Sequence, residues 1–399
     1  MSKWDEPPVE GAVNGMGAKV LRILAAIDER PILYLADDET EAEGLASVLT
    51  ALLPDLPVIH VPASDTLPGE DAPASPANIG HRVTALRRLR AMSQDENEVK
   101  PIVVASGEAA AHRYQAPPAF DAAPPIIRVG DTINPESFAE QAVAQGYFAD
   151  DRIDEPGEIA VRGEVIDLFP ADAGGPVRID IADGKIAGIC HFDPVTQMRG
   201  EPCDELEIGR ATEPAEPSDT ILLDHLSAGI VLSSPLAEKR RRGYVKLAER
   251  MAKQVKSEVD AISNDRWLEA LRDWRTESDL NTDDRNAIEA IPRFAESKAT
   301  ARAVKRFLDA ELKAKRPIVL VGNERDLRFL RVRLKGVLPA ASQNADTSAT
   351  SNTSFTKTWP SFCFAAAGCN SSAMPELCAL SSTMRSSSDR RTEKPKCLA

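Results

Sequence analysis

The stretch PILYLADDETEAEGL, residues 31–45, decides the fold class of most of this 399-residue chain. A proline precedes a continuous apolar run, and a polar turn then opens a helical pattern. Two further stretches repeat this design, PIVVASGEAAAHR at 101–113 and PIVLVGNERDLRFL at 317–330. Continuous apolar runs followed by helices are typical of parallel strands that are covered on both faces. The sequence therefore predicts an α/β domain with a parallel sheet.

A helix is expected directly before the first of these strands. AKVLRILAAIDER, residues 18–30, places four apolar side chains at helical spacing and ends before Pro31: Val20, Ile23, Leu24 and Ile27. The chain therefore begins as helix, strand and helix.

Composition limits the classes of protein to which the chain can belong. Hydrophobic residues make up 43% and charged residues 28% of the chain, and no run approaches the ~18 apolar residues that span a bilayer. Six cysteines and five histidines are dispersed, which predicts a reducing cytoplasm, no metal site and no membrane partner. The net charge of −14 argues against a chain whose main role is to grip a phosphate backbone, although a local basic patch stays open.

The pattern changes between residues 126 and 206, where short alternating strands replace long apolar runs. PESFAEQAVAQG, residues 135–146, reads as a helix with proline at its start and glycine at its end. Asp183-Gly184 is a strong hairpin signal. Four strands are predicted, at 158–162, 165–169, 177–182 and 185–192.

The sequence divides into four parts. Residues 1–125 and 213–340 are predicted to be two halves of one α/β domain, and residues 126–212 an inserted α+β domain. Of the last 59 residues, 341–399, 19 are Ser or Thr, and four of the six cysteines lie there. We expect a disordered tail or a stretch outside the native reading frame, in which case the chain is a fragment of a longer protein.

EPGEIAVRGEVIDLFPA (155–171) and PVRIDIADGKIAGICHFDPVTQ (176–197) together carry a family resemblance. They resemble the UvrA-interaction domain shared by UvrB and the transcription-repair coupling factors of bacterial nucleotide excision repair. SDTLPGEDAPASPANIGHRVTALRRL (64–89) is similar to the N-terminal module of the coupling factors. UvrB inserts an aromatic-rich hairpin into DNA, but residues 64–89 contain no Tyr, Phe or Trp. The resemblance therefore favours the coupling factors.

The resemblance also implies a P-loop-type domain, and the loop itself is degenerate. Aligned with the family pattern GVTGSGKT, the segment AVNGMGAK (12–19) keeps Gly15 and Gly17 but has Ala18 at the lysine position and Lys19 at the hydroxyl position. A shift by one residue places Val20 where the hydroxyl is needed. No acid pair follows the apolar run that ends at Pro235. These residues predict a vestigial nucleotide site, no bound cofactor and no ATPase activity.

Arg162 and Arg178 are the candidate partner-binding residues. The two-residue period sends Ile159 and Val161 inward, and Glu158, Ala160 and Arg162 outward; in 177–182 it sends Arg178, Asp180 and Ala182 outward. One interpretation is a solvated face on which Arg178 pairs with Asp180 or Glu158. In the family that the chain resembles, arginines at these two positions contact UvrA, and Gly163 is expected to bend or bulge the chain beside Arg162. Ala182 stands where the coupling factors carry an aromatic residue.

The resemblance implies a non-catalytic module that recruits UvrA in transcription-coupled repair. It also implies RNA polymerase and double-stranded DNA as partners of a longer parent protein. Two alternatives stay open: a divergent nucleotide hydrolase using Lys19, and a stand-alone regulator that binds UvrA. The basic clusters at 238–246 and 325–335 are either solvated helix faces or contacts to DNA or to an acidic protein.

Overall fold

The structure is a computed structural model of the whole chain. It describes residues 16–70, 72–95, 99–256, 259–278, 289–290, 300–313 and 318–323, together with residues 328–329, 332, 343–345, 362–367, 376–379 and 396–397. Across these ranges, no helix combines the length and the apolar character needed to cross a membrane.

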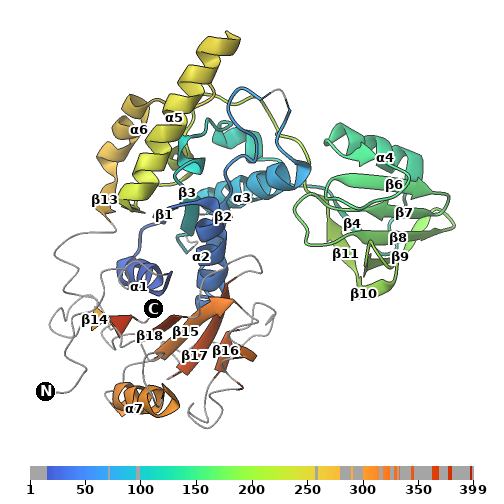
Figure 1. Cartoon of the computed structure of the whole chain (residues 1–399). Coiled ribbons are helices and arrows are strands. Elements are labelled where there is room, and N and C mark those ends of the chain that lie inside the picture. The colour runs from blue at the N-terminus through green and yellow to red at the C-terminus, as the bar shows by residue number, and fades with distance from the viewer. Residues whose placement is uncertain are drawn as a thin grey trace, which may run out of the picture.

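A five-stranded parallel sheet forms the centre of the larger domain (Figure 1). Its strand order is β13-β12-β1-β3-β2, and every neighbouring pair is parallel. The strands are β1 (Ile32–Ala36), β2 (Val58–Val61), β3 (Ile102–Ser106), β12 (Ile230–Ser233) and β13 (Arg275–Ser278). Strands β1 and β3 come from the first two repeats of the proline-led design, so the predicted parallel sheet is confirmed.

Helices cover both faces of this sheet, which explains why its inner strands are apolar along their whole length. Helices α1 (Met16–Ala26) and α2 (Glu39–Leu52) pack on one face in a single hydrophobic cluster. Helices α3 (Pro76–Gln94), α5 (Pro235–Val255) and α6 (Asn264–Ala270) contribute to the cluster on the other face. Helix α1 is the predicted first helix: Val20, Ile23 and Leu24 are buried in it, but it ends at Ala26, before Ile27.

A second domain stands to one side of the parallel sheet, with α3 reaching toward it (Figure 1). Its six-stranded sheet has the order β10-β9-β8-β7-β6-β5 and is covered by α4 (Pro135–Ala144). The helix, the four strands and the hairpin that the sequence predicts are all present. The strands are β5 (Phe148–Ala149), β6 (Glu158–Arg162), β7 (Val165–Leu168), β8 (Val177–Ala182), β9 (Lys185–Phe192) and β10 (Arg199–Cys203).

The two ends of this domain lie beside each other. β4 (Ile126–Arg128) is its first strand and β11 (Glu205–Glu207) its last, and the two pair antiparallel. The chain therefore enters and leaves the domain at one place. This is the geometry that an inserted domain requires, because the host domain can then close around it.

Helix α3 joins the two domains by direct contact. Arg82 is buried and donates through Nε and Nη2 to Oε1 of Glu213, at 3.0 and 2.6 Å. Thr84 donates to Asp172 at 2.7 Å. A Cβ added at Gly80 would lie 2.6 Å from the Cβ of Ala171. The close approach of the two backbones thus depends on a glycine in the middle of a helix.

The third repeat of the proline-led design differs from the expectation. Its strand β15 (Ile318–Asn323) does not join the parallel sheet. It lies in a separate sheet, between β17 and β18. The remaining elements are α7 (Thr300–Lys313), β14 (Glu289–Ala290), β16 (Gln343–Ala345), β17 (Phe362–Ala367), β18 (Glu376–Ala379), β19 (Lys396–Cys397) and the 3-10 turns η2 (Ala109–Ala111), η3 (Pro117–Phe120), η4 (Leu222–His225) and η5 (Leu271–Asp273). Strands β16 to β19 lie in the segment predicted to be a disordered tail, most of which falls outside the described residues.

Two helical glycines give a matched test of the contact between the domains. Alanine is favoured over glycine inside a helix by ~1 kcal/mol, and a Cβ at Gly243 in α5 meets nothing within 4 Å. Gly243→Ala should therefore raise the melting temperature. Gly80→Ala should lower it, because overpacking against Ala171 costs about 1–3 kcal/mol. Differential scanning fluorimetry measures the direction in which each variant shifts the melting temperature. An upward shift for Gly80→Ala would show that the domains are not in close contact.

Candidate functional site

Arg162 and Arg178 lie on strands that flank β7, and the carboxylate of Asp167 on β7 lies between them. Arg178 donates to both carboxylate oxygens of Asp167, from Nε at 2.6 Å and from Nη2 at 2.9 Å. Arg162 donates to the same carboxylate through Nη2. The two arginines that the sequence singled out are therefore brought together. They share one acid, so the cluster carries a net positive charge.

Exposure separates the roles of the three side chains. The side chain of Asp167 is 0% exposed, that of Arg178 is 15% exposed and that of Arg162 is 49% exposed. Hydrogen bonding to Asp167 raises the pKa of Arg178. Arg178 is thus fixed in the sheet, while half of the surface of Arg162 is available to a partner.

The ring of Phe192 and the side chain of Gln197 hold Arg178 from the other side. The guanidinium carbon lies 4.5 Å from the centre of the Phe192 ring, and Nη2 donates to Oε1 of Gln197 at 3.0 Å. A buried apolar cluster surrounds that ring: Ile153, Ala160, Phe169 and Phe192. Part of the outer face of the sheet is therefore buried.

That covered face corrects two parts of the sequence prediction. Both residues lie on the predicted faces, since Val161 pairs with Ile166 of the core and Ala160 pairs with Asp167 on the outer face. Their burial differs from the expectation: Ala160 is buried in the outer apolar cluster, whereas Val161 is 37% exposed. The pairing of Arg178 with Asp180 or Glu158 is also wrong. Asp180 instead accepts from Arg199, at 2.5 and 2.8 Å, and the hydrogen bonds from Arg199 lower the pKa of the Asp180 carboxyl.

Gly163 forms a hairpin turn rather than a bulge. β6 ends at Arg162 and β7 begins at Val165, and these two residues are register partners. Gly163 is the first of the two turn residues and has φ +61°, the conformation that a two-residue hairpin of type II′ needs at this position. The predicted bend is present, and it places Arg162 beside the turn, at the tip of the hairpin.

Ala182 is exposed at the far end of β8, before the turn formed by Asp183 and Gly184. Both turn residues have positive φ, at 52° and 70°. The outward position of Ala182 therefore agrees with the prediction, and the methyl group offers no large apolar contact there.

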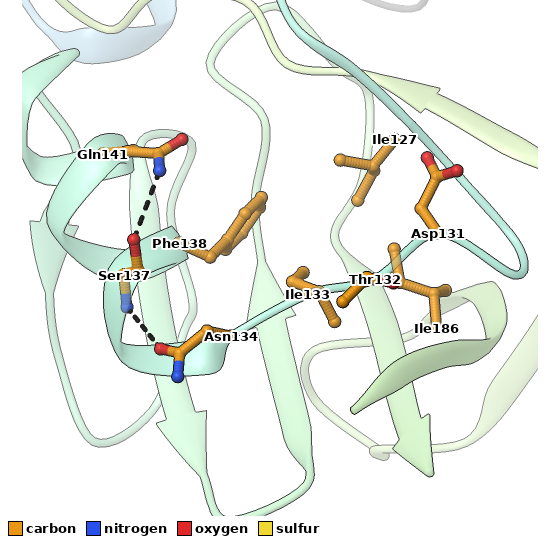
Figure 2. A pocket seen from close by; sticks show the side chains of 9 residues that line it. All are labelled: Ile127, Asp131, Thr132, Ile133, Asn134, Ser137, Phe138, Gln141 and Ile186. Carbon is orange, nitrogen blue, oxygen red and sulfur yellow. Dashed lines mark hydrogen bonds between the residues drawn. The ribbon is translucent and has the colours of Figure 1, made fainter. Parts of the chain in front are cut away.

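A cavity of about 500 Å³ opens at the N-terminus of α4, away from the arginines. Figure 2 shows that its polar groups already serve the helix: Asn134 accepts from the backbone N–H of Ser137 at 2.9 Å, and Gln141 donates to the Ser137 hydroxyl at 3.3 Å. The carboxylate of Asp131 accepts from the backbone N–H of Arg128. The groups that line this cavity are thus engaged in local structure.

The predicted nucleotide loop leads into α1. Gly17, Ala18 and Lys19 lie in the first turn of this helix and are buried, whereas Gly15 lies outside the described residues. Lys19 Nζ donates to Asp37 at 2.9 Å and to Glu41 at 2.5 Å. Burial by itself would lower the pKa of Lys19, but the charges and hydrogen bonds of Glu41 and Asp37 outweigh burial and raise it.

This ion-pair cluster lies at the carboxyl edge of the parallel sheet. Asp37 follows β1, and Ser234, which follows β12, donates to it. The neighbouring strand ends are where open α/β sheets bind ligands. Here the lysine and the hydroxyl both contact protein carboxylates. Within the described residues, no group of three or more metal-binding side chains is arranged around an ion site.

Sequence reasoning missed Asp167, although a signal was present. An acid between Ile166 and Leu168 in an otherwise apolar strand needs a partner if it is buried. The hairpin at Gly163 and the two-residue period would have placed it opposite Ala160 and next to the strand of Arg178. Asp37 and Glu41 gave no comparable signal, because acids are common at helix N-termini.

Comparison with known families identifies the smaller domain. Residues 126–213 match the model of the UvrB interaction domain, one residue more than the predicted segment. The chain is 32% identical over 192 residues to the transcription-repair-coupling factor of Bacillus subtilis, which covers 48% of this chain and 16% of that protein. It is 27% identical over 260 residues to the UvrABC system protein B of Pasteurella multocida, covering 58% of this chain and 37% of that protein.

These similarities reach about half of the chain. A coupling factor of Staphylococcus epidermidis is 26% identical over 222 residues, or 55% of this chain and 18% of that relative. The chain thus spans less than a fifth of the length of these coupling factors and about two fifths of that of protein B. It contains a UvrB interaction domain and is homologous to both kinds of protein.

Removal of the buried acid gives the next prediction. Asp167→Ala should destabilise strands β6 to β8 by about 3–5 kcal/mol, because the largely buried charge of Arg178 would lose its carboxylate partner. Asp180→Ala removes a more exposed pair with Arg199 and should cost less than ~1 kcal/mol. Hydrogen–deuterium exchange of peptides from β6 to β8 measures the difference locally. Equal protection in the two variants would contradict a structural role for the Asp167 carboxylate.

Proposed function

We propose that this chain is a non-catalytic module that recruits UvrA, and that it belongs to a transcription-repair coupling factor acting in transcription-coupled nucleotide excision repair. Homology to coupling factors and to the UvrABC system protein B supports the repair role, and the UvrB interaction domain at residues 126–213 supports UvrA as the partner. RNA polymerase and double-stranded DNA are expected partners of a longer parent protein.

The observation that carries the proposal is the arginine pair held by Asp167. A partner reaching this face meets the half-exposed guanidinium of Arg162 next to the fixed guanidinium of Arg178. The planar fork of arginine binds carboxylates with two parallel hydrogen bonds. Because the site is already ordered, docking loses little side-chain entropy. An acidic patch on UvrA is therefore the expected counterpart.

Substitution of Arg162 tests this docking face. Arg162→Ala should weaken UvrA binding about 30-fold, since truncation of a central interfacial arginine costs ~2 kcal/mol. Arg162→Glu should weaken it about a hundredfold or more, because the new charge repels the acidic partner groups. Titration of UvrA in a calorimeter measures both affinities.

The matched control is Arg152→Glu, which reverses another exposed arginine in the same domain, one that pairs with Asp154. It should leave the affinity for UvrA within about twofold. Thermal melts establish that all variants are folded. Unchanged affinity in folded Arg162 variants would remove the docking face. Ala182→Phe, which restores a large apolar side chain on this face, should strengthen binding.

The non-catalytic part of the proposal rests on the carboxyl edge of the parallel sheet. Lys19 is buried between Asp37 and Glu41, so the lysine of the loop segment already has carboxylate partners. Two acids beside it would repel the phosphates of a nucleotide. Ser234 and Pro235 follow β12 in place of a metal-binding acid pair.

The expected result is that ATP with Mg²⁺ neither binds nor is hydrolysed. ATP at 100 times its dissociation constant would stabilise a binding protein by about 2.7 kcal/mol, so thermal melts with and without millimolar ATP should coincide. Lys19→Ala should lower the melting temperature, because it leaves Asp37 and Glu41 without their cation. A melting temperature raised by ATP in the wild type and not in Lys19→Ala would favour the nucleotide hydrolase instead.

A further inference from the structure

Helix α5 has one buried face and one charged face. Its buried residues recur at helical spacing: Ala237, Arg241, Val245, Ala248 and Ala252. Ala237 packs in the cluster under the parallel sheet, and Val245 and Ala248 pack with Ala111 and Ala261. Arg241 belongs to this buried set, with its guanidinium carbon 5.0 Å from the centre of the Trp267 ring and two hydrogen bonds to Glu238. The basic cluster at 238–246 is therefore not one solvated face, because one of its arginines is structural.

The opposite side of α5 carries a row of exposed cations, which we call the basic stripe: Lys239, Arg242, Lys246, Arg250 and Lys253. Their spacings of three or four residues keep them within an arc of about 80° on a helix of 3.6 residues per turn. Two further exposed residues, Gly243 and Glu249, lie at the two edges of the stripe. The helix as a whole has seven Lys and Arg against two Glu, in a chain of net charge −14.

Few protein carboxylates neutralise the stripe. Arg242 forms an ion pair with Glu238 at 3.2 Å, whereas the structure shows no ion pair for Lys239, Lys246, Arg250 or Lys253 among its described residues. Solvated helix faces usually alternate charges, because opposite charges three or four residues apart stabilise a helix and like charges destabilise it. The basic stripe thus carries a small stability cost that a polyanionic partner would remove.

We propose that the basic stripe of α5 binds the phosphate backbone of double-stranded DNA. The stripe extends over 15 residues from Lys239 to Lys253, or about 21 Å at 1.5 Å per residue step, and α5 projects beyond its neighbours at the top of Figure 1. One strand of a duplex presents a phosphate about every 3.4 Å along the axis, so about six phosphates lie within that length. Five cations match this row. The contact would be independent of sequence, because phosphates carry no base identity.

The stripe does not depend on the proposed UvrA docking. Arg162 and Arg178 belong to the sheet of the inserted domain, whereas α5 packs on the parallel sheet of the other domain. DNA and UvrA would therefore contact different domains of the chain. The chain would have one surface for each partner.

The test is a titration of the full chain against a fluorescently labelled 20-base-pair duplex at several salt concentrations. Binding to five phosphates predicts a fall in affinity of up to about 500-fold between 50 and 200 mM salt. Lys246→Gln/Arg250→Gln should weaken binding at 50 mM salt at least tenfold and reduce the logarithmic salt slope by about 1.8. Glutamine keeps a high helix propensity, so α5 should remain folded.

The matched control is Arg128→Gln/Arg152→Gln, which removes two exposed cations from the inserted domain and should leave DNA affinity unchanged. UvrA binding by the Lys246 and Arg250 variant should also be unchanged, which shows that the variant is folded and separates the two surfaces. The proposal is overturned if the wild type does not bind the duplex, or if both double variants bind it equally. It is also overturned if polyglutamate of equal charge displaces the duplex as well as unlabelled DNA does, since the partner would then be an acidic protein.

Discussion

Helix α3 must pack against two domains at once, and the arrangement of the chain depends on this constraint. Ile79, Val83 and Leu86 of α3 lie in the hydrophobic cluster under the parallel sheet. Between them, Gly80 allows the inserted domain to approach, and Arg82 forms a buried ion pair with it. Apolar burial against the parallel sheet holds α3 on one side. On the other side, the close contact at Gly80 and the ion pair of Arg82 with Glu213 hold it. A larger side chain at Gly80 would keep the contact with the sheet but push the inserted domain away.

The outer face of the inserted domain shows how one buried acid can order two arginines at a surface. A carboxylate removed from water is stable only when it is paired and hydrogen-bonded. Asp167 meets this condition by accepting from two arginines, and these arginines then have fixed positions. The acid that is hidden from solvent therefore determines where the positive charge is presented. In our proposal that charge selects an acidic partner.

The carboxyl edge of the parallel sheet uses the same physics to a different end. Lys19 is also buried and also paired, but it has two carboxylate partners of its own, Asp37 and Glu41. The charges are satisfied internally, in the place where such sheets usually bind a ligand. On the inserted domain, by contrast, two cations share one acid and leave positive charge for a partner. The number of acids per cation therefore differs between the two clusters.

The sequence by itself determined the local elements and the outward direction of the two arginines on which the proposed docking face rests. Apolar runs predicted β1 and β3, and the two-residue period and turn residues predicted β6 to β9. The same period predicted that Arg162 and Arg178 point outward. These features depend on the geometry of neighbouring residues along the chain. They are therefore largely independent of tertiary contacts.

Only the tertiary structure decided what those elements contact. Asp167 joins Arg162 to Arg178 because β7 lies between their strands, and strand order is not encoded in any one strand. Arg241 is buried although its neighbours in the basic cluster are exposed, because α6 supplies Trp267 from a distant segment. The physical reason is the same in each case. Periodicity fixes the direction of a side chain relative to its own backbone, whereas burial and pairing depend on what the rest of the chain brings to that side.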